Sequence, residues 1–156
     1  MFLDLAKAFD SVDHSILIRK LQKYGIRGNA LELMKSYLQN RYHFVNIGNV
    51  NSVPLILKYG VPQGSVLGPF LFLLFVNDLP NCTKFDVTLF ADDTFLKLQS
   101  HNLTDLKKQA NKEMNKVGDW LISNNLTLNV GKSKYMIIHR KKNKVTQIKT
   151  RKMSRI

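Results

Sequence analysis

Apolar residues three and four positions apart predict two helices near the start of the chain. The first opens near Asp13 or Ser15 and stops at Gly25, since glycine is typical of helix ends. The second covers residues 28–41 and is predicted to be capped by Asn29. The positions that form the two apolar faces are Ile16, Leu17, Leu21 and Tyr24 in the first helix, and Leu31, Met34, Tyr37 and Leu38 in the second.

Residues 43–61 replace this helical spacing with the alternation that is typical of a β-hairpin. A first strand alternates over residues 44–48, a turn rich in Asn, Gly and Ser follows, and a second strand covers residues 53–59. Residues 62–79 then predict a glycine-containing loop that leads into a buried helix, with Pro69 in the first turn of that helix.

β-Branched and aromatic residues predict a second hairpin over residues 85–99, with Ala91, Asp92 and Asp93 at its tip. An amphipathic helix is expected over residues 103–126, with Leu103, Leu106, Ala110, Met114, Val117 and Leu121 facing inward. A turn at Gly131 leads into a strand over residues 135–139. Because helices and local hairpins are mixed, the pattern predicts an α+β fold and not a doubly wound parallel sheet.

The composition is that of a globular protein with one domain: 156 residues, of which 44% are hydrophobic and 22% are charged. The apolar run from Pro69 to Val76 is far shorter than the roughly 20 residues that cross a bilayer, and no secretory signal opens the chain. A single cysteine, Cys82, excludes a disulfide framework within the chain. We therefore expect an intracellular protein of the nucleus or cytoplasm, neither secreted nor bound to a membrane.

A net charge of +13 predicts an anionic partner such as nucleic acid. Residues 140–156 carry eight basic residues and no acid, so much of the excess charge lies at the C-terminal end. We expect residues 1–139 to form the folded domain and residues 140–156 to be a basic, disordered tail. A dedicated binding arm is the alternative interpretation of the tail.

Two adjacent acids interrupt the apolar segment LFADDTFL, and they are candidates for chemistry. Asp92 and Asp93 repel each other, and apolar neighbours would reduce their hydration. Asp4 has similar surroundings in MFLDLA, which also reads as a strand. Acids from two strand ends that meet would need a cation, and Mg²⁺ prefers carboxylate oxygens while keeping positions open for phosphates. The alternative is an ordinary hairpin turn with solvated acids.

The segment YGVPQGSVLGP, residues 59–69, contains three glycines, two prolines and one long polar side chain, that of Gln63. Glycine lets a backbone approach a ligand closely, so this loop is a candidate ligand-binding loop. A plain connection before a helix is the alternative.

Four motifs taken together resemble one known family. FLDLAKAFDSVDH, GVPQGSVLGPFLF, LFADDTFL and LTLNVGKSKYM occur in the order and spacing of four successive motifs of the reverse transcriptase palm. They are most similar to reverse transcriptases of non-LTR, LINE-like retrotransposons, and the resemblance covers residues 2–139. It implies the palm fold, which is an antiparallel sheet with helices packed on one face.

The resemblance implies RNA-directed DNA polymerase activity, in which a deoxynucleotide (dNTP) is added to the 3′-hydroxyl of a DNA primer on an RNA template. Asp4, the Leu5 carbonyl, Asp92 and Asp93 would bind two Mg²⁺ ions, for which Mn²⁺ could substitute. Lys132 corresponds to a lysine that would neutralise or protonate pyrophosphate, with a solvated turn lysine as the alternative.

Other positions are similar to the family's nucleotide-binding residues. The Phe9 ring would lie under the incoming sugar and exclude a 2′-hydroxyl, unless Phe9 only packs in the core. The backbone amides of Lys7, Ala8 and Phe9 would line the triphosphate. Gln63 and Gly64 would contact the nucleotide and the template.

Compared with this family, the chain is expected to lack the fingers and thumb, which hold the triphosphate, the template and the primer and would be needed for full activity. A catalytically inactive retrotransposon remnant, inert or binding nucleic acid through its basic surface, is therefore the alternative function. A two-metal nuclease would share the carboxylates, but it does not account for Phe9 or for the loop at Gln63.

Overall fold

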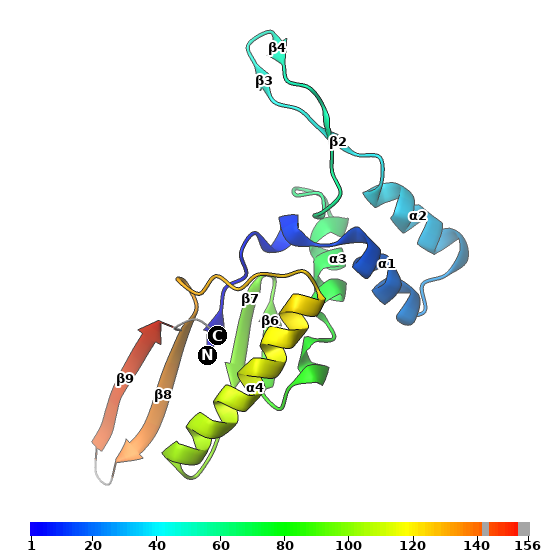
Figure 1. Ribbon diagram of the computed structural model, residues 1–156. Coiled ribbons are helices and arrows are strands. Elements are labelled where there is room, and N and C mark those ends of the chain that lie inside the picture. The colour runs from blue at the N-terminus through cyan, green and yellow to red at the C-terminus, as the bar shows by residue number, and fades with distance from the viewer. Residues whose placement is uncertain (142–143, 153–156) are drawn as a thin grey trace. The chain divides into compact units, whose positions relative to one another are not determined.

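Two compact units make up the chain in the computed structural model, which describes the backbone of residues 1–141 and 144–152 and the side chains of residues 1–138. The sheet unit comprises Met1–Ala8 and Asn77–Ile156, and the helical unit comprises Phe9–Val76. Among the described residues every strand pairing is antiparallel, and both units contain helices (Figure 1). The predicted mixture of helices and antiparallel strands is confirmed.

An antiparallel sheet with the strand order β6-β7-β1-β8-β9 organises the sheet unit (Figure 1). In the described part of the chain its strands are β1 (Phe2–Leu3), β6 (Asp86–Phe90), β7 (Asp93–Lys97), β8 (Lys134–Lys141) and β9 (Lys144–Lys152). β1 lies at the centre, where Phe2 pairs with Phe95 of β7 and with Lys134 of β8. The shortest of these strands is thus held on both sides.

The β6–β7 hairpin forms as predicted, because β-branched and aromatic residues flank a tight turn. Phe90 pairs with Asp93, so Ala91 and Asp92 are the two residues of the turn. Ala91 has φ +51°, and two-residue hairpin turns need a positive φ at this first position. The local sequence therefore places one acid in the turn and the next at the start of β7.

Helix α4 (Leu103–Ser123) lies beside η2 (Leu79–Cys82) and along β6 and β7 (Figure 1). Its amphipathic pattern is confirmed by the buried side chains of Met114, Val117 and Leu121. The prediction for Leu103 is wrong, since this side chain is 45% exposed. Leu103 is the first residue of the helix, where the apolar face has reached its end.

A buried acid, Glu113, connects α4 to the segment before β6. Its Oε2 accepts hydrogen bonds from the Lys84 backbone N–H at 2.7 Å and from the Thr83 hydroxyl at 3.1 Å. The Lys116 ammonium lies 2.9 Å from Oε1. The bond from Lys116, followed by that from the Lys84 N–H, lowers the pKa of Glu113 to about 2. The acid therefore stays charged although it is buried.

Strand β9 differs from the expectation for the tail. The sequence predicts disorder over residues 140–156, whereas Lys144–Lys152 pair with β8 in the structure. Four residues of this strand are β-branched, and such residues favour extended backbone even among lysines: Val145, Thr146, Ile148 and Thr150. Residues 142–143 and 153–156, which belong to the predicted tail, lie outside the described residues.

The helical unit contains α1 (His14–Lys23), α2 (Gly28–Leu38) and α3 (Leu67–Val76), and η1 (Ala8–Ser11) precedes them. α1 begins as predicted, because the Asp13 carboxylate accepts hydrogen bonds from the backbone N–H groups of Ser15 and Ile16. The predicted stop is also confirmed, since Gly25 follows the helix with φ +92°.

The predicted cap of α2 is wrong. The helix starts at Gly28, so Asn29 lies inside its first turn, and the capping residue is Arg27. Arg27 has extended backbone and makes no side-chain cap hydrogen bond. Gly28 has φ +56°, which glycine adopts without a steric penalty, and the helix begins two residues before the start that a cap at Asn29 would give.

Buried side chains of all three helices form the core of the helical unit: Leu17, Leu21, Leu31, Leu38, Leu71, Phe72 and Phe75. α1 packs against α2 and α3. The Lys20 ammonium of α1 donates to the Phe75 carbonyl at 2.6 Å and lies 4.8 Å from the centre of the Phe75 ring. A cation at this carbonyl complements the negative end of the α3 dipole.

The hairpin predicted over residues 43–61 is confirmed, but it is divided into two short ladders. β2 (Tyr42–His43) pairs with β5 (Leu55–Ile56), and β3 (Asn46–Ile47) pairs with β4 (Val50–Asn51). Pro54 lies between β4 and β5 and has no N–H to donate, so the ladder is interrupted there. We call residues 42–56 the ribbon, and Figure 1 shows it extending away from the helices of its own unit.

Among the described residues, none of the helices combines the length and the apolarity needed to span a bilayer.

Candidate active site

Three carboxylates lie at one end of β1 and β7 in the sheet unit. Phe2 pairs with Phe95 and Leu3 with Thr94, so the continuation of this register past the end of β1 would set Asp4 opposite Asp93. Opposed residues of an antiparallel pair share a face, so Asp4 and Asp93 would lie on the face that carries the Phe2 and Phe95 rings, whose centroids are 4.7 Å apart. Asp92 precedes them in the turn. The register therefore puts the three predicted acids at the same end of β1 and β7, and among the described residues they form no group that could hold a metal ion by itself.

These carboxylates have no compensating cation among the described residues, because none of the three accepts a hydrogen bond or forms an ion pair there. Asp4 is half-buried, and Asp92 and Asp93 are exposed. The expected loss of hydration is wrong for the latter two, because the neighbouring Phe90 is itself 75% exposed. The three carboxylates therefore carry like charges that no cation of the described chain neutralises.

Hydrogen bonds fix the backbone of Asp4 from the side opposite β7. The Asp4 N–H donates to the Ser133 hydroxyl at 3.1 Å, and the Asp4 carbonyl accepts from the Asn129 N–H at 2.8 Å. The Ser133 hydroxyl in turn donates to the Asn129 carbonyl at 2.9 Å, and Ser133 is fully buried. The sequence analysis did not single out Asn129 or Ser133, although both lie in the motif LTLNVGKSKYM.

Four other predicted site residues belong to the sheet unit. Leu5 is buried and bridges to residue 128, next to the hydrogen bonds that fix Asp4. Lys132 is exposed and immediately precedes the serine that fixes Asp4. Lys7 is exposed with φ +49°, and Ala8 is buried. The chain thus leaves β1 through a turn in which the Lys7 side chain reaches solvent.

The donor set at this end of the sheet fits a divalent cation in its chemistry. Asp4, Asp92 and Asp93 offer carboxylate oxygens, which Mg²⁺ prefers, and their charges have no internal partner in the described chain. Among the described residues, no three His, Cys, Asp or Glu side chains lie close enough to hold a metal ion by themselves. Mg²⁺ commonly completes its ligands with water and phosphate oxygens, so a preformed cage is not required.

Phe9, Gln63 and Gly64 belong to the helical unit, where the structure brings their backbones together. The Val61 N–H donates to the Phe9 carbonyl at 2.8 Å, which joins the glycine-containing loop to the end of the first motif. The Gln63 Nε2 donates to the Asp10 carboxylate at 2.6 Å, and Gly64 has φ +77°. Asp10 thereby orients the Gln63 amide.

The loop passes so close to residues 9–12 that only glycine fits at position 60. The Gly60 N–H donates to the Val12 carbonyl at 2.8 Å, and Gly60 has φ +88°. A Cβ at this position would lie 3.0 Å from the Asp10 Cα and 3.2 Å from the Phe9 carbonyl oxygen. The close approach predicted for the loop is therefore made to another part of the chain.

The Phe9 ring packs against Phe72, with ring centroids 4.7 Å apart, and Phe9 is half-buried. The core-packing interpretation of Phe9 is thus supported by a contact within the helical unit. Part of the ring stays accessible, so a contact with a sugar is a separate proposal.

The sequence matches one family model over residues 1–152, and this model describes the reverse transcriptase (RNA-dependent DNA polymerase) family. The chain belongs to the reverse transcriptase family. The resemblance inferred from four motifs is therefore confirmed.

Related reverse transcriptases come from insect mobile elements. The "Probable RNA-directed DNA polymerase from transposon BS" of Drosophila melanogaster is 33% identical over an alignment of 134 residues, and the match covers 77% of this chain and 14% of that protein. The "RNA-directed DNA polymerase from mobile element jockey" of Drosophila funebris is 29% identical over an alignment of 139 residues, and the match covers 84% of this chain and 15% of that protein. A "Retrovirus-related Pol polyprotein from type-1 retrotransposable element R2" of Popillia japonica is 29% identical over an alignment of 108 residues, and the match covers 60% of this chain and 18% of that protein.

This reverse transcriptase chain spans between 14% and 18% of the length of those three relatives. The match shows that the chain is a member of the reverse transcriptase family, whereas the roles of its single residues stay predictions.

Proposed function

We propose that this chain forms the palm of an RNA-directed DNA polymerase, which adds deoxynucleotides to a primer 3′-hydroxyl on an RNA template. The observation that supports the proposal is the register of β1 and β7, whose continuation would set Asp4 opposite Asp93, with Asp92 in the adjacent turn. Carboxylates at one end of a sheet are suitable ligands for a divalent cation, because Mg²⁺ prefers carboxylate oxygens.

The proposed ligands of two Mg²⁺ ions are the Asp4, Asp92 and Asp93 carboxylates and the Leu5 carbonyl, with Mn²⁺ as a substitute. When bound, such ions lower the pKa of the attacking hydroxyl and neutralise charge on the triphosphate. The protein's part is to hold the acids in place. Asp4 is well suited to this, because β7 pairs with its strand and the Ser133 hydroxyl accepts its N–H.

The proposed role of Lys132 is to protonate or neutralise the pyrophosphate that leaves as the primer oxygen bonds to the α-phosphorus. Its support is positional, since Lys132 is exposed and adjoins Ser133. In the same proposal the backbone amides of Lys7, Ala8 and Phe9 line the triphosphate.

Selection of the nucleotide is assigned to the helical unit. Gln63 and Gly64 would contact the nucleotide and template, and the hydrogen bond to Asp10 supports a fixed orientation of the Gln63 amide. The Phe9 ring would exclude a 2′-hydroxyl by filling the space under the sugar.

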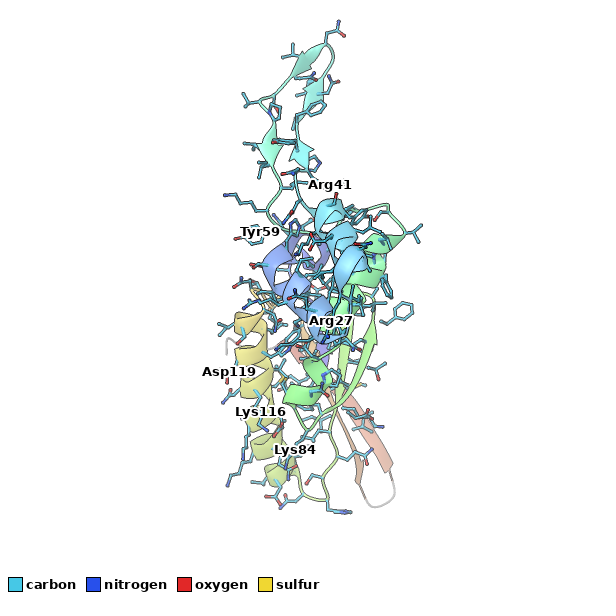
Figure 2. The ribbon with its side chains drawn as sticks, turned by 90° about the vertical axis from the view of Figure 1, so that its right-hand side faces the viewer. Arg27, Arg41, Tyr59, Lys84, Lys116 and Asp119 are labelled. Carbon is cyan, nitrogen blue, oxygen red and sulfur yellow. The ribbon has the colours of Figure 1, made fainter. Side chains whose placement is uncertain are left out.

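Primer extension on an RNA template with Mg²⁺ and deoxynucleotides tests the proposal. We expect extension by the unaltered chain and none by Asp92→Asn, because this change removes one ligand charge. Asp119→Asn is the matched control, since Asp119 is an exposed acid on α4 (Figure 2). Equal extension by the unaltered chain and by Asp92→Asn would contradict the proposed site.

A non-catalytic nucleic-acid-binding remnant is the second candidate, and the net charge of +13 favours it. It predicts RNA binding by the folded chain without any extension, and equal RNA affinity for Asp92→Asn and Asp119→Asn.

A further inference from the structure

A cleft of about 620 Å³ lies within the helical unit, where α1, α2 and the end of β5 meet. Its apolar lining comes from Ile18, Leu38, Ile56 and Leu57, and Leu38 is only 1% exposed. Its charged and aromatic lining comes from Asp13, His14, Arg19, Lys35, Lys58 and Tyr59. The cleft is thus a concave surface with an apolar base and a mostly basic rim.

The charges around the cleft are unbalanced. Asp13 is its one lining acid among the described residues, and the Asp13 carboxylate already accepts hydrogen bonds at the start of α1. Lys35 is paired with Glu32 at 2.8 Å. Arg19 and Lys58 are exposed and have no partner among the described residues, so the cleft carries two uncompensated cations. A concave, partly apolar surface concentrates the potential of such charges.

The walls of the cleft are held in place by hydrogen bonds within the helical unit. Asp13 and Tyr59 form a β-bridge, and the His14 ring nitrogen Nε2 lies 2.7 Å from the Gly60 carbonyl. The Leu57 N–H donates to the Arg41 carbonyl at 2.8 Å. Lys58 and Tyr59 are thus carried by a backbone segment that is anchored at both ends, which lowers the cost of ordering them around a ligand.

An aromatic side chain accompanies the cations. Tyr59 is 55% exposed beside the cleft, and Figure 2 shows it near the base of the ribbon. Tyr42 and Phe44 at the start of the ribbon are 59% and 54% exposed. Residues 33–77 contain no acid, so neither the ribbon nor its base repels a polyanion.

We propose that this cleft binds a single strand of RNA, with Arg19 and Lys58 contacting backbone phosphates and Tyr59 stacking on a base. Cations that follow a backbone, combined with exposed aromatic rings, are the features by which proteins bind single strands. The site lies entirely in the helical unit and uses no residue of the proposed polymerase site. Its test is therefore independent of polymerisation.

Fluorescence anisotropy of a labelled single-stranded RNA with the full chain tests the proposal. We expect Arg19→Gln with Lys58→Gln to weaken binding about 10-fold and to reduce the logarithmic salt slope by about 1.4, since each phosphate contact to a single strand contributes about 0.7. The matched control is Arg27→Gln with Lys112→Gln, which removes the same charge from exposed residues outside the cleft. We expect this control to change affinity less than about 2-fold.

Tyr59→Ala tests the stacking contact separately. We expect a loss of about 5-fold or more, while Tyr59→Phe retains affinity because it keeps the ring. All substituted side chains are exposed, so thermal unfolding should be unchanged. The charge-preserving pair Arg19→Lys with Lys58→Arg should bind as the unaltered chain does.

Three results would overturn the proposal. The first is equal affinity of the cleft variant and its matched control. The second is displacement of RNA by pyrophosphate at equal phosphate concentration, which would assign the cleft to free phosphate groups. The third is equally effective competition by poly-glutamate, which would assign it to acidic peptides.

Discussion

Glu113 is a buried acid whose ionisation depends on the fold. In the unfolded chain its pKa has the ordinary value of 4.5, and in the folded chain the contacts from Lys116, Lys84 and Thr83 lower the pKa to about 2. A lowered pKa in the folded state means that the stabilisation is fully present above about pH 4.5 and is lost as the pH falls toward 2.

We predict that Glu113→Gln lowers the free energy of unfolding at pH 7 and that the deficit shrinks below pH 4.5, because the Glu113 carboxyl then binds a proton in the unfolded chain, whereas in the folded chain it is protonated only near pH 2. Urea unfolding at pH 7 and at pH 3 measures this. Glu32→Gln is the control, because Glu32 forms an exposed ion pair with Lys35 and should change stability little at either pH. An equal loss of unfolding free energy at pH 7 and at pH 3 would contradict the assignment of this stabilisation to the ionised Glu113 carboxylate.

Phe9 combines a packing contact with a proposed role in sugar selection. We predict that Phe9→Ala raises the incorporation of ribonucleotides relative to deoxynucleotides by about 10-fold or more, because the ring no longer fills the space of a 2′-hydroxyl. Competitive primer extension with matched nucleotide pairs measures the ratio.

Phe72→Leu is the control for this change. It weakens the Phe9–Phe72 ring contact, which is worth about 0.5–1.5 kcal/mol beyond area burial, without altering the Phe9 side chain. An increase in ribonucleotide use by Phe72→Leu equal to that by Phe9→Ala would assign the effect to loosened packing.

The three acids could be singled out as candidates from sequence because like charges between apolar runs stand out locally. Asn129 and Ser133 could not, because their importance arises only from hydrogen bonds to Asp4, which is more than 120 residues away. The partner of Gln63 was likewise missed, since Asp10 lies 53 residues earlier in the chain.

At the scale of elements, the loop before α3 depends on a single glycine. We predict that Gly60→Ala destabilises the helical unit by about 1–3 kcal/mol, because φ is +88° and the new Cβ would crowd the Asp10 Cα and the Phe9 carbonyl. Thermal unfolding measures the loss.

Gly48→Ala is the control that separates the cost of a positive φ from the cost of steric crowding. Gly48 in the ribbon turn has φ +60°, and a Cβ there would meet no atom within 4 Å. Gly48→Ala should therefore lower the free energy of unfolding only by the cost of the positive φ, which is about 1 kcal/mol. Equal losses for Gly60→Ala and Gly48→Ala would show that the crowding at Gly60 does not matter.

Elements whose contacts are local were predicted well, and elements fixed by unusual backbone were not. The β6–β7 hairpin and α1 follow from turn and cap residues within a few positions. The cap of α2 was missed because Gly28 begins the helix at a positive φ, which no pattern of apolar residues encodes. β9 was missed because charge outweighed its β-branched residues in the sequence argument.

At the scale of the whole molecule, charge is concentrated near one end. Residues 140–156 carry eight basic residues and no acid, within a net charge of +13. We predict that deleting them largely abolishes nucleic-acid binding and flattens its salt dependence more than the two cleft substitutions do, because more counterion-releasing contacts are lost. Anisotropy titrations at salt concentrations from about 50 to about 200 mM measure the affinity for nucleic acid and its salt dependence.

A full-length variant with the same eight bases replaced by Gln is the control for that deletion. It removes the charge and keeps the chain that includes β9, so it should reproduce the loss if charge is the cause. Retention of tight, salt-sensitive binding by either variant would contradict the prediction.

The central place of β1 has a consequence for the order of folding. Phe2 pairs with Phe95 and Lys134, and the Asp4 N–H reaches a hydroxyl 129 positions away. Residues 95 and 134 must therefore both be synthesised before β1 can pair with its two neighbours, whereas the β6–β7 hairpin needs only nearby residues. We therefore expect β1, which ends next to Asp4, to join the sheet only after the β6–β7 hairpin has formed.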